Sequence, residues 1–464
     1  MKNPFSHDEV FIAQLKSIEQ QINKNQLQEA AEQLNLLAKT SSHDPRLFLL
    51  GSHLAGASRN PDGMLKAARK AHSLAPKWPV ATMHLASVQA SRDQVLEAMA
   101  LAEKALEQAA SQTGDDIELL AKAASIAQRL FRYDTALKWL RQAEKINPGD
   151  FIIRQQIGRT LSSSGDHAGA IGIYTDMLLQ VPNHPSLLLD RLRACLAASQ
   201  MEQAISDGEA LTAIKPNDEE YGFYLAIARG ETPKTQPVSI VKRLFDGSAD
   251  HFDRHLVLLL QYKLPDDVAK MIHQWHRDRK GDVLDLGCGT GLLGAYLGSI
   301  DGVLVGVDVS MQMIEQAKLR RVYDRFHNVN LLDALQATPD SLYHVIAALD
   351  VLNYTGDLSA VIPNAHRILL PGGHFVFSCE SGADSDANYA LQSTYRYTHQ
   401  RSYVLRLMQE AGFTDIILED RVLRQDLGQP VHGFLITATK PSQTVEKSTR
   451  RPGIKNTGLV RPLN

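Results

Sequence analysis

Three glycines just past the middle of the chain form the pattern with the clearest chemical use. Gly287, Gly289 and Gly291 follow the apolar run 282–286 and precede an amphipathic stretch. Glycines at the junction of a strand and a helix let the backbone turn sharply and approach a ligand without a Cβ clash. The first turn of such a helix also presents free N–H groups. The spacing therefore predicts a nucleotide-type binding loop.

Two patterns are compatible with this loop. Gly289, Gly291 and Gly294 satisfy the dinucleotide fingerprint of dehydrogenases, with Asp308 near the offset expected for a ribose-binding acid. The second pattern needs an acidic residue inside the strand, two positions before the first glycine, and Asp285 stands there. In both patterns Asp308 suits ribose, because the two oxygens of a carboxylate match the spacing of a diol.

The elements that position this loop are indicated by short apolar runs after about residue 280. Candidate strands separated mostly by amphipathic helices are 282–286, 303–307, 329–332, 344–349 and 374–379. This alternation predicts a parallel sheet with helices on both faces. The runs 415–420 and 433–439 have no helix between them, so we expect an antiparallel pair at one edge.

Over about residues 240–440 the chain resembles the class I S-adenosylmethionine-dependent methyltransferases. The resemblance rests on the loop DVLDLGCGTGLLG, on LLPGGHFVF before the fifth strand, and on the terminal hairpin, which is unusual for a dehydrogenase. It implies a Rossmann-like fold and S-adenosyl-L-methionine as cofactor. It also implies the cofactor-binding residues, which are Asp285 with Gly287, Gly289 and Gly291 for the methionine part, Asp308 for the ribose hydroxyls and Asp333 for the adenine amino group.

The segment 245–253 (FDGSADHFD) resembles the FDxxAxxFD segment that covers the cofactor in several small-molecule methyltransferases. The resemblance implies a cofactor contact from Phe252. A second interpretation stays open, because Phe245 and Phe252 are seven residues apart and can form one apolar face of a helix packed on the sheet.

Candidate residues near the transferred methyl group follow from the rule that ligands of open α/β sheets bind beyond the carboxyl ends of the strands. The rule points to Asp350, Asn353 and Tyr354 after the fourth strand and to Glu380 after the fifth. His399 belongs to a stretch, 396–399, that resembles one in bacterial methyltransferases fused to repeats. Glu380 and His399 are therefore the candidate general bases, with a helix-capping position as the alternative for His399. An acceptor that is already nucleophilic needs no base.

The first half of the chain has a 34-residue period. It is marked by Pro148, Pro182 and Pro216 and by Ala68, Ala102, Ala136, Ala170 and Ala204. This period is typical of the tetratricopeptide helix–turn–helix unit, in which a small residue allows close helix packing and a proline ends the second helix. We expect about six helix pairs between residues 8 and 216 and a closing helix at 217–229. The resemblance to the tetratricopeptide family implies a concave surface that binds a protein or peptide.

Together these patterns predict a multidomain chain. Its expected parts are an all-α tetratricopeptide solenoid (1–229), a linker (230–238), an α/β Rossmann-like methyltransferase domain (239–440, with a helical lid at 239–280) and a disordered basic tail (441–464).

Composition excludes several classes of function. The net charge of −3 gives no general attraction to nucleic acid or to an anionic membrane. The polar N-terminus is not that of a signal peptide, and no run of eighteen apolar residues predicts a membrane span. Three scattered cysteines lack metal-ligand spacing, so we expect no metal and a reducing, cytoplasmic environment.

The function predicted from the sequence is methyl transfer to a small molecule or to a protein side chain, with the array binding a protein partner. An Asn-Pro-Pro-Tyr element after the fourth strand would indicate methylation of adenine or of a glutamine amide. This chain has AALDVLNY at that place, which counts against both acceptors. The alternative is a non-catalytic interaction scaffold whose methyltransferase-like domain only binds the cofactor.

Overall fold

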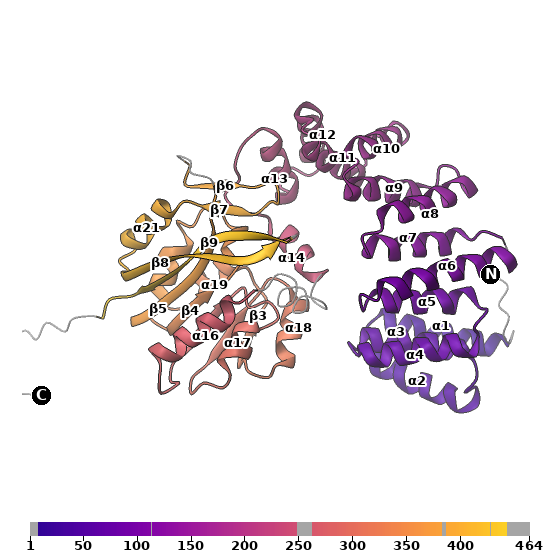
Figure 1. The fold of residues 1–464 in the computed structure, drawn as a ribbon, viewed down its shortest axis with the longest axis horizontal. Helices are drawn as coiled ribbons and strands as arrows, with labels where there is room; N and C mark the ends of the chain where they lie inside the picture. The colour runs from indigo at the N-terminus through magenta and orange to yellow at the C-terminus, as the bar shows by residue number, and fades with distance from the viewer. Residues whose placement is uncertain (1–7, 113, 248–261, 383–386, 427, 443–464) are drawn as a thin grey trace, which may run out of the picture. The chain divides into compact units, whose positions relative to one another are not determined.

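The computed structural model describes residues 8–442 except 113, 248–261, 383–386 and 427. The chain divides into two compact units, Met1–Arg229 and Gly230–Asn464 (Figure 1). Most of the predicted basic tail and the predicted lid residue Phe252 lie outside the described residues. None of the described helices is both long and apolar enough to cross a membrane.

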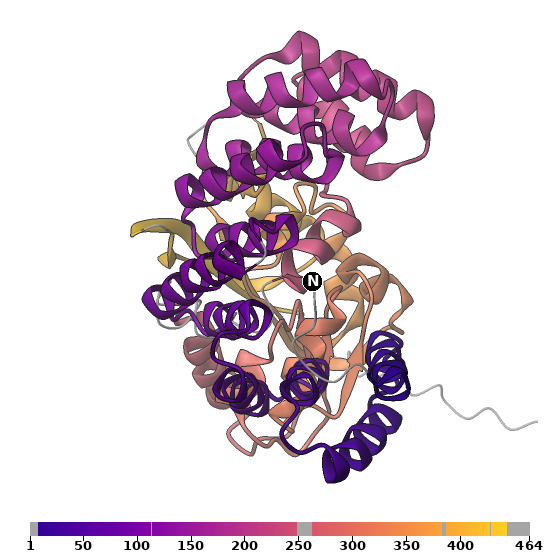
Figure 2. The same ribbon diagram turned by 90° about the vertical axis from the view of Figure 1, so that its right-hand side faces the viewer.

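The first unit is a stack of helix pairs, and its neighbouring helices pack in chain order (Figure 2). The six pairs are α1 (Glu9–Asn23) with α2 (Leu27–Thr40), α3 (Pro45–Ala57) with α4 (Pro61–Leu74), α5 (Pro79–Ala90) with α6 (Val95–Gln112), α7 (Ile117–Arg129) with α8 (Tyr133–Ile146), α9 (Phe151–Ser164) with α10 (His167–Gln180) and α11 (Pro185–Ala197) with α12 (Met201–Ile214). A single helix, α13 (Glu219–Ala228), follows. The predicted six pairs and closing helix are confirmed.

The repeated alanines and prolines have the packing roles expected from their spacing. Each of the five periodic alanines lies on the second helix of a pair and is fully buried. Pro148, Pro182 and Pro216 follow the ends of α8, α10 and α12. Close packing is most evident at Gly158 of α9, where a Cβ would lie 2.5 Å from the ring of Tyr174 on α10.

A groove of about 1020 Å³ lies in this unit. Its walls come from the first helices of successive pairs, α1, α3, α5 and α7, with one residue from α9. The lining mixes apolar side chains such as Leu49 and Met83 with the exposed charges Lys16, Glu19 and Lys122. The first helices of the pairs thus form the concave surface that the repeat predicts.

The described residues of the second unit form a nine-stranded sheet with the path β3-β2-β1-β4-β5-β7-β6. Strands β1 to β5 are parallel, whereas β9 runs antiparallel to β5 and pairs with β8. The strands are β1 (Val283–Leu286), β2 (Leu304–Val307), β3 (Arg325–His327), β4 (Tyr343–Ala348), β5 (Leu369–Glu380), β6 (Tyr389–Leu391), β7 (Tyr397–His399), β8 (Thr414–Asp426) and β9 (Gln429–Thr439). The predicted parallel sheet and terminal antiparallel pair are confirmed.

Helices cover both faces of this sheet. α16 (Leu264–Trp275) and α17 (Leu292–Leu297) pack on one face, through Val268, Ile272 and Leu293 among others. α19 (Leu331–Ala337), α20 (Val361–Ile368) and α21 (Arg401–Glu410) pack on the other face. Two more helices, α14 (Val238–Asp246) and α18 (Met311–Leu319), contact each other. The sheet is thus buried between helical layers, and its carboxyl edge is left to bind a ligand.

One predicted strand is wrong. The run 329–332 was expected to be the third strand, but β3 ends at His327 and this run begins α19. The Asn330 side chain accepts a hydrogen bond from the backbone N–H of Leu332 and caps this helix. Leu331 and Leu335, four residues apart, are the buried pair, which is a helical and not a strand spacing.

The second half of the segment predicted as a linker, 230–238, forms backbone hydrogen bonds with the second unit. Thr235 forms a β-bridge with Thr355, and the backbone N–H of Gln236 donates to the carbonyl of Tyr354 at 3.0 Å. Gly356 and Asp357 donate backbone hydrogen bonds to the carbonyl of Lys234. Residues 234–238 therefore belong to the second unit, because their backbone groups find partners there despite their polar composition.

Candidate active site

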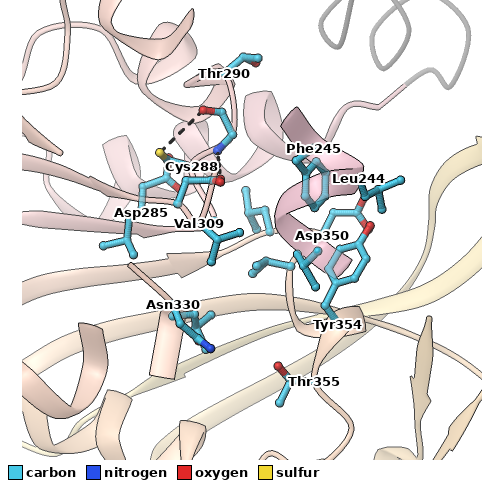
Figure 3. Close-up of a pocket in the computed structure, with 18 of the residues that line it drawn as sticks. Leu244, Phe245, Asp285, Cys288, Thr290, Val309, Asn330, Asp350, Tyr354 and Thr355 are labelled. Carbon is cyan, nitrogen blue, oxygen red and sulfur yellow. Dashed lines mark hydrogen bonds between the residues drawn. The ribbon is translucent and has the colours of Figure 1, made fainter. Parts of the chain in front are cut away.

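A cavity of about 320 Å³ lies at the carboxyl ends of the central strands (Figure 3). Figure 3 shows Asp285, Cys288 and Val309 on one side and Phe245, Asp350 and Tyr354 on the other. We call the first the glycine-loop side; it comprises residues 285–293, 307–309 and 329–331. We call the second the Arg424 side; its lining residues include Asp350, Tyr354, Arg396, Arg424 and Asp426.

The three glycines of the loop all adopt positive φ angles, at +71° for Gly287, +52° for Gly289 and +80° for Gly291. These are left-handed conformations that side chains other than glycine rarely adopt. At Gly287 a Cβ would also lie 2.5 Å from the side chain of Val351. Gly287 and Gly289 line the cavity and Gly291 begins α17, so the turn delivers backbone amides to the cavity wall.

Asp285, on β1, is buried and lines the cavity. Burial raises the pKa of this carboxyl to about 7; the hydrogen bond from Tyr323 opposes the shift and the nearby Asp308 adds to it. The Tyr323 hydroxyl donates to Oδ2 of Asp285 at 2.6 Å and accepts from the backbone N–H of Gly294 at 3.2 Å. Sequence reasoning missed Tyr323, which holds Asp285 against the glycine loop.

Asp308 follows β2 and lines the same side. Its Oδ2 accepts from the backbone N–H of Gly289 at 2.9 Å, and its Oδ1 accepts from that of Ser310 at 2.8 Å. Burial raises the pKa of this carboxyl to about 6. Each oxygen of a carboxylate can accept a second hydrogen bond, so Asp308 retains acceptor capacity toward the cavity.

Asp333 is not placed as predicted. It lies exposed in the first turn of α19 and does not line the cavity. The residues after β3 that do line the cavity are Val329, Asn330 and Leu331. The shift of three positions follows from the misassigned strand, because β3 ends earlier than expected and its carboxyl end therefore presents Asn330.

The helix α14 forms one wall of the cavity through Val241, Leu244 and Phe245. The ring of Phe245 meets that of Tyr354 edge to face, with centroids 5.4 Å apart. Asp246 at the end of α14 accepts a hydrogen bond from the Ser310 hydroxyl at 2.6 Å, which ties this helix to α18. Within the cover predicted at 239–280 the structure describes α14 and α16 as helices, whereas residues 276–280 are not helical.

On the Arg424 side, four residues form a closed ring of hydrogen bonds, which we call the four-residue ring. Arg424 donates to Oδ1 of Asp350 and to Oε1 of Glu380, both at 2.5 Å. Asn353 donates to the same two oxygens, at 3.2 Å and 3.0 Å. The members come from the loop after β4, the end of β5 and the last residues of β8, and Arg424 is almost completely buried.

The two predicted general bases do not reach the cavity. Glu380 is buried behind its wall, where Oε1 is held by Arg424 and Asn353. His399 is buried on β7, and its Nε2 lies 2.9 Å and 3.1 Å from the carbonyls of Thr355 and Gly356. Since a carbonyl only accepts, Nε2 carries the proton. Burial lowers the pKa of His399 to about 4, so the neutral ring supports the loop 355–356 instead of acting on a substrate.

Arg396 lines the cavity, as do Tyr354 and Asp426. Its guanidinium lies 3.5 Å from a carboxylate oxygen of Asp426. The 396–399 stretch therefore contributes to the cavity through its arginine and not through its histidine. Gln236, from the predicted linker, also lines the cavity, and no described residue bonds its buried Oε1.

The residues of the glycine-loop side fit S-adenosylmethionine. Gly287 and Gly289 line the cavity without side chains, which suits a ligand that approaches the backbone closely. Asp285 and Asp308 are buried carboxylates near its ends, suited to an ammonium group and to a ribose diol respectively. No group of three or more metal-ligating side chains that could hold an ion occurs among the described residues.

Comparisons with known proteins agree with this geometry. Residues 284–375 match the profile of a family described as methyltransferase domain. Phosphoethanolamine N-methyltransferase 1 of Arabidopsis thaliana is 33% identical over 152 residues, which is 30% of this chain and 30% of that protein. The chain spans about a third of the length of the plant relatives that it matches.

Two solved structures are similar to separate parts of the chain. An S-adenosylmethionine-dependent methyltransferase of Methanosarcina mazei is 18% identical and has a TM-score of 0.30, with 37% of this chain and 98% of that chain covered. PilW, a type IV pilus biogenesis factor, is 16% identical and has a TM-score of 0.41, with 47% and 99% covered. The predicted methyltransferase domain agrees with the family match over residues 284–375.

Proposed function

We propose that this chain, whose second unit contains a methyltransferase domain, transfers a methyl group from S-adenosylmethionine to a small-molecule or protein acceptor. The observation that carries the proposal is the cavity at the carboxyl edge of the sheet. One side offers the glycine turn, Asp285 and Asp308, and the other offers a charged cluster around Arg424. A bound S-adenosylmethionine supplies an electrophilic methyl group on a sulfonium.

The chain's own residues then bind and orient the cofactor. Asp285 suits the ammonium group of the cofactor, and Asp308 suits the two ribose hydroxyls. Asn330 lines the cavity at the carboxyl end of β3 and is the better candidate than Asp333 for the adenine ring. The apolar side chains of α14 exclude water from the cavity, which strengthens these charged interactions.

A small-molecule acceptor is supported by the name of the Arabidopsis relative, which acts on phosphoethanolamine. A protein acceptor is supported by the groove of the array, since concave repeat surfaces bind partners. We propose that the array binds a protein or peptide and raises the local concentration of a partner near the enzyme. A cytoplasmic location stays a prediction.

Calorimetry with S-adenosylmethionine and with NAD tests the cofactor first. We expect only S-adenosylmethionine to bind. If neither compound binds, the chain is better described as a scaffold that does not use the cavity. Transfer of a labelled methyl group is then measured into a cell extract separated into protein and small-molecule fractions. Binding without transfer into any fraction would favour the non-catalytic scaffold.

The role of the array is tested by removing residues 1–229. Because all cavity-lining residues belong to the second unit, we expect the remaining fragment to keep its affinity for S-adenosylmethionine. Transfer to the natural acceptor should fall if the array recruits it. Unchanged transfer to every acceptor would contradict the recruitment role.

A further inference from the structure

The two oxygens of Asp350, a carboxylate on the Arg424 side of the cavity, have different surroundings. Its Oδ1 is held by Arg424 and Asn353 as part of the four-residue ring. No hydrogen bond to Oδ2 is found within the part of the chain that the structure describes. The side chain lines the cavity and retains 17% of its exposure, so one oxygen is fixed and the other remains available to a ligand.

The backbone at Asp350 is also held in an uncommon conformation. Its φ angle is +53°, a left-handed value that is uncommon for residues other than glycine and that aspartate and asparagine adopt more often than most. The Ser378 hydroxyl on β5 accepts a hydrogen bond from its N–H at 2.9 Å and keeps it there. Backbone strain of this kind is retained at functional sites when surrounding contacts enforce it. The ring and Ser378 together fix both the main chain and the side chain.

We propose that Asp350 is a catalytic residue that takes the proton lost by a hydroxyl or amine acceptor when this acceptor is methylated. The inference rests on the proposed function. In the step, a lone pair on the acceptor oxygen or nitrogen forms a bond to the methyl carbon, and the carbon–sulfur bond breaks with its electron pair moving to sulfur. The acceptor proton passes to Oδ2 of Asp350 and then to water, so charge and atoms balance.

The other carboxylates are less suited to this role. Glu380 is outside the cavity lining and is held by the same ring, which makes it a positioning residue. Asp285 and Asp308 belong to the glycine-loop side. Asp426 lines the cavity, but its side chain is 44% exposed, so water weakens its basicity and its control over a proton.

The environment of Asp350 also raises its basicity above that of an exposed aspartate. Burial raises its pKa above the ordinary value, whereas Arg424 opposes this shift and keeps the carboxylate available. The side chain is rigid because Arg424 is fixed in turn by Glu380. The inferred acceptor class is therefore a hydroxyl or amine that must lose a proton, and not a thiolate, which needs no base.

The test compares the full-length chain with Asp350→Asn and with the matched control Asp420→Asn. Asp420 lies on β8 and pairs with Arg401, but it is exposed and outside the cavity lining. Three quantities are measured for each: the affinity for S-adenosylmethionine, the melting temperature, and the pH profile of methyl transfer into whichever fraction of a cell extract, protein or small-molecule, the parent chain labels. A parent chain that neither binds nor transfers would refute the proposed function itself, independently of Asp350.

We expect Asp350→Asn to reduce transfer by about a hundredfold or more, the usual contribution of a positioned base, while the cofactor affinity stays close to that of the parent. The acid side of the pH profile should disappear. Asp420→Asn should match the parent. Transfer by Asp350→Asn at a rate within about threefold of the parent would overturn the proposal.

A second variant, Asp350→Gly, guards against misfolding. Glycine suits the positive φ angle, and its introduction leaves Arg424 paired with Glu380 alone. Added formate, a small carboxylate, should restore part of the lost transfer in this variant and not in the parent. Loss of cofactor binding together with transfer in both variants would make Asp350 a structural residue and also overturn the proposal.

Discussion

The two sides of the cavity are constructed in different ways. The glycine-loop side comes from one continuous stretch, about residues 285–331, and its main contacts involve backbone amides. The Arg424 side is assembled from residues far apart in the chain, and it is held by side-chain hydrogen bonds between the loop after β4, β5 and β8. The turn depends on residues that can adopt positive φ angles, whereas the buried ring of charges depends on the side chain of each of its members.

The largest effect of this difference is expected for Arg424→Ala. The substitution leaves Asp350 and Glu380 as buried carboxylates without their counter-ion. Removing one partner of a buried ion pair costs about 3–5 kcal/mol, and we expect that loss in the free energy of unfolding of the second unit. Chemical denaturation followed by circular dichroism measures it.

Arg401→Ala is the control for this measurement. Arg401 pairs with Asp420 on the surface, where both side chains are largely exposed, so the loss should be below about 1 kcal/mol. Equal losses in the two variants would mean that the four-residue ring does not stabilise the Arg424 side.

The next largest effect concerns the glycine-loop side. We expect Asp308→Ala to weaken S-adenosylmethionine binding by about 1.5–3 kcal/mol, the range for charge-assisted hydrogen bonds. Asp308→Asn should lose less, because an amide oxygen can still accept from Gly289. Calorimetry gives both values, and an unchanged affinity in a folded Asp308→Ala chain would contradict the assignment to ribose.

The sequence predicts the glycine-loop side better than the Arg424 side, because the residues of the glycine-loop side are closer together in the chain. Asp285, Asp308 and the glycines could be identified because a turn between a strand and a helix has a local spacing. Asn330 was missed by three positions, since the short run 329–332, with three apolar residues, does not distinguish a strand from the first turn of a helix. The contribution of Gln236 was hidden by proline-rich surroundings that are typical of linkers.

The Arg424 side was predicted only in part. The rule on strand ends correctly pointed to the neighbourhood of Asp350 and Tyr354. It did not predict that Arg424, 74 residues further along the chain, would donate hydrogen bonds to both Asp350 and Glu380. No local spacing encodes such a contact, because it depends on the antiparallel return of β8 and β9 beside β5.

An effect of pH should also distinguish the two sides. Burial raises the pKa of Asp285 to about 7 in the cofactor-free chain, yet the carboxylate form is the one that binds an ammonium group. Below pH 7 the carboxyl is increasingly protonated, so the affinity for S-adenosylmethionine should fall by up to about tenfold per pH unit. Calorimetry at pH 6 and pH 8 measures this change.

The control for the pH effect is Asp285→Asn, whose weaker affinity should vary little over the same range. The release of a proton from Asp285 when the cofactor binds is an independent readout. The buffer takes up this proton, so the measured heat of binding depends on the ionisation enthalpy of the buffer. Equal affinity of the parent chain at pH 6 and pH 8 would mean that Asp285 does not ionise on binding.

The smallest expected effect is a change in cofactor affinity that shows whether Asn330 or Asp333 contacts the adenine. Asn330→Asp keeps the helix cap, because a carboxylate still accepts from the N–H of Leu332, but it removes the amide N–H donor next to the cavity. We expect a loss of about 0.5–1.5 kcal/mol in cofactor affinity, the usual net value of one hydrogen bond. Asp333→Asn, at an exposed position outside the cavity lining, should leave the affinity unchanged. The opposite pattern would show that α19 moves on binding and brings Asp333 to the adenine, so that the spacing of the sequence motif, and not the geometry of the cofactor-free chain, identifies the contact.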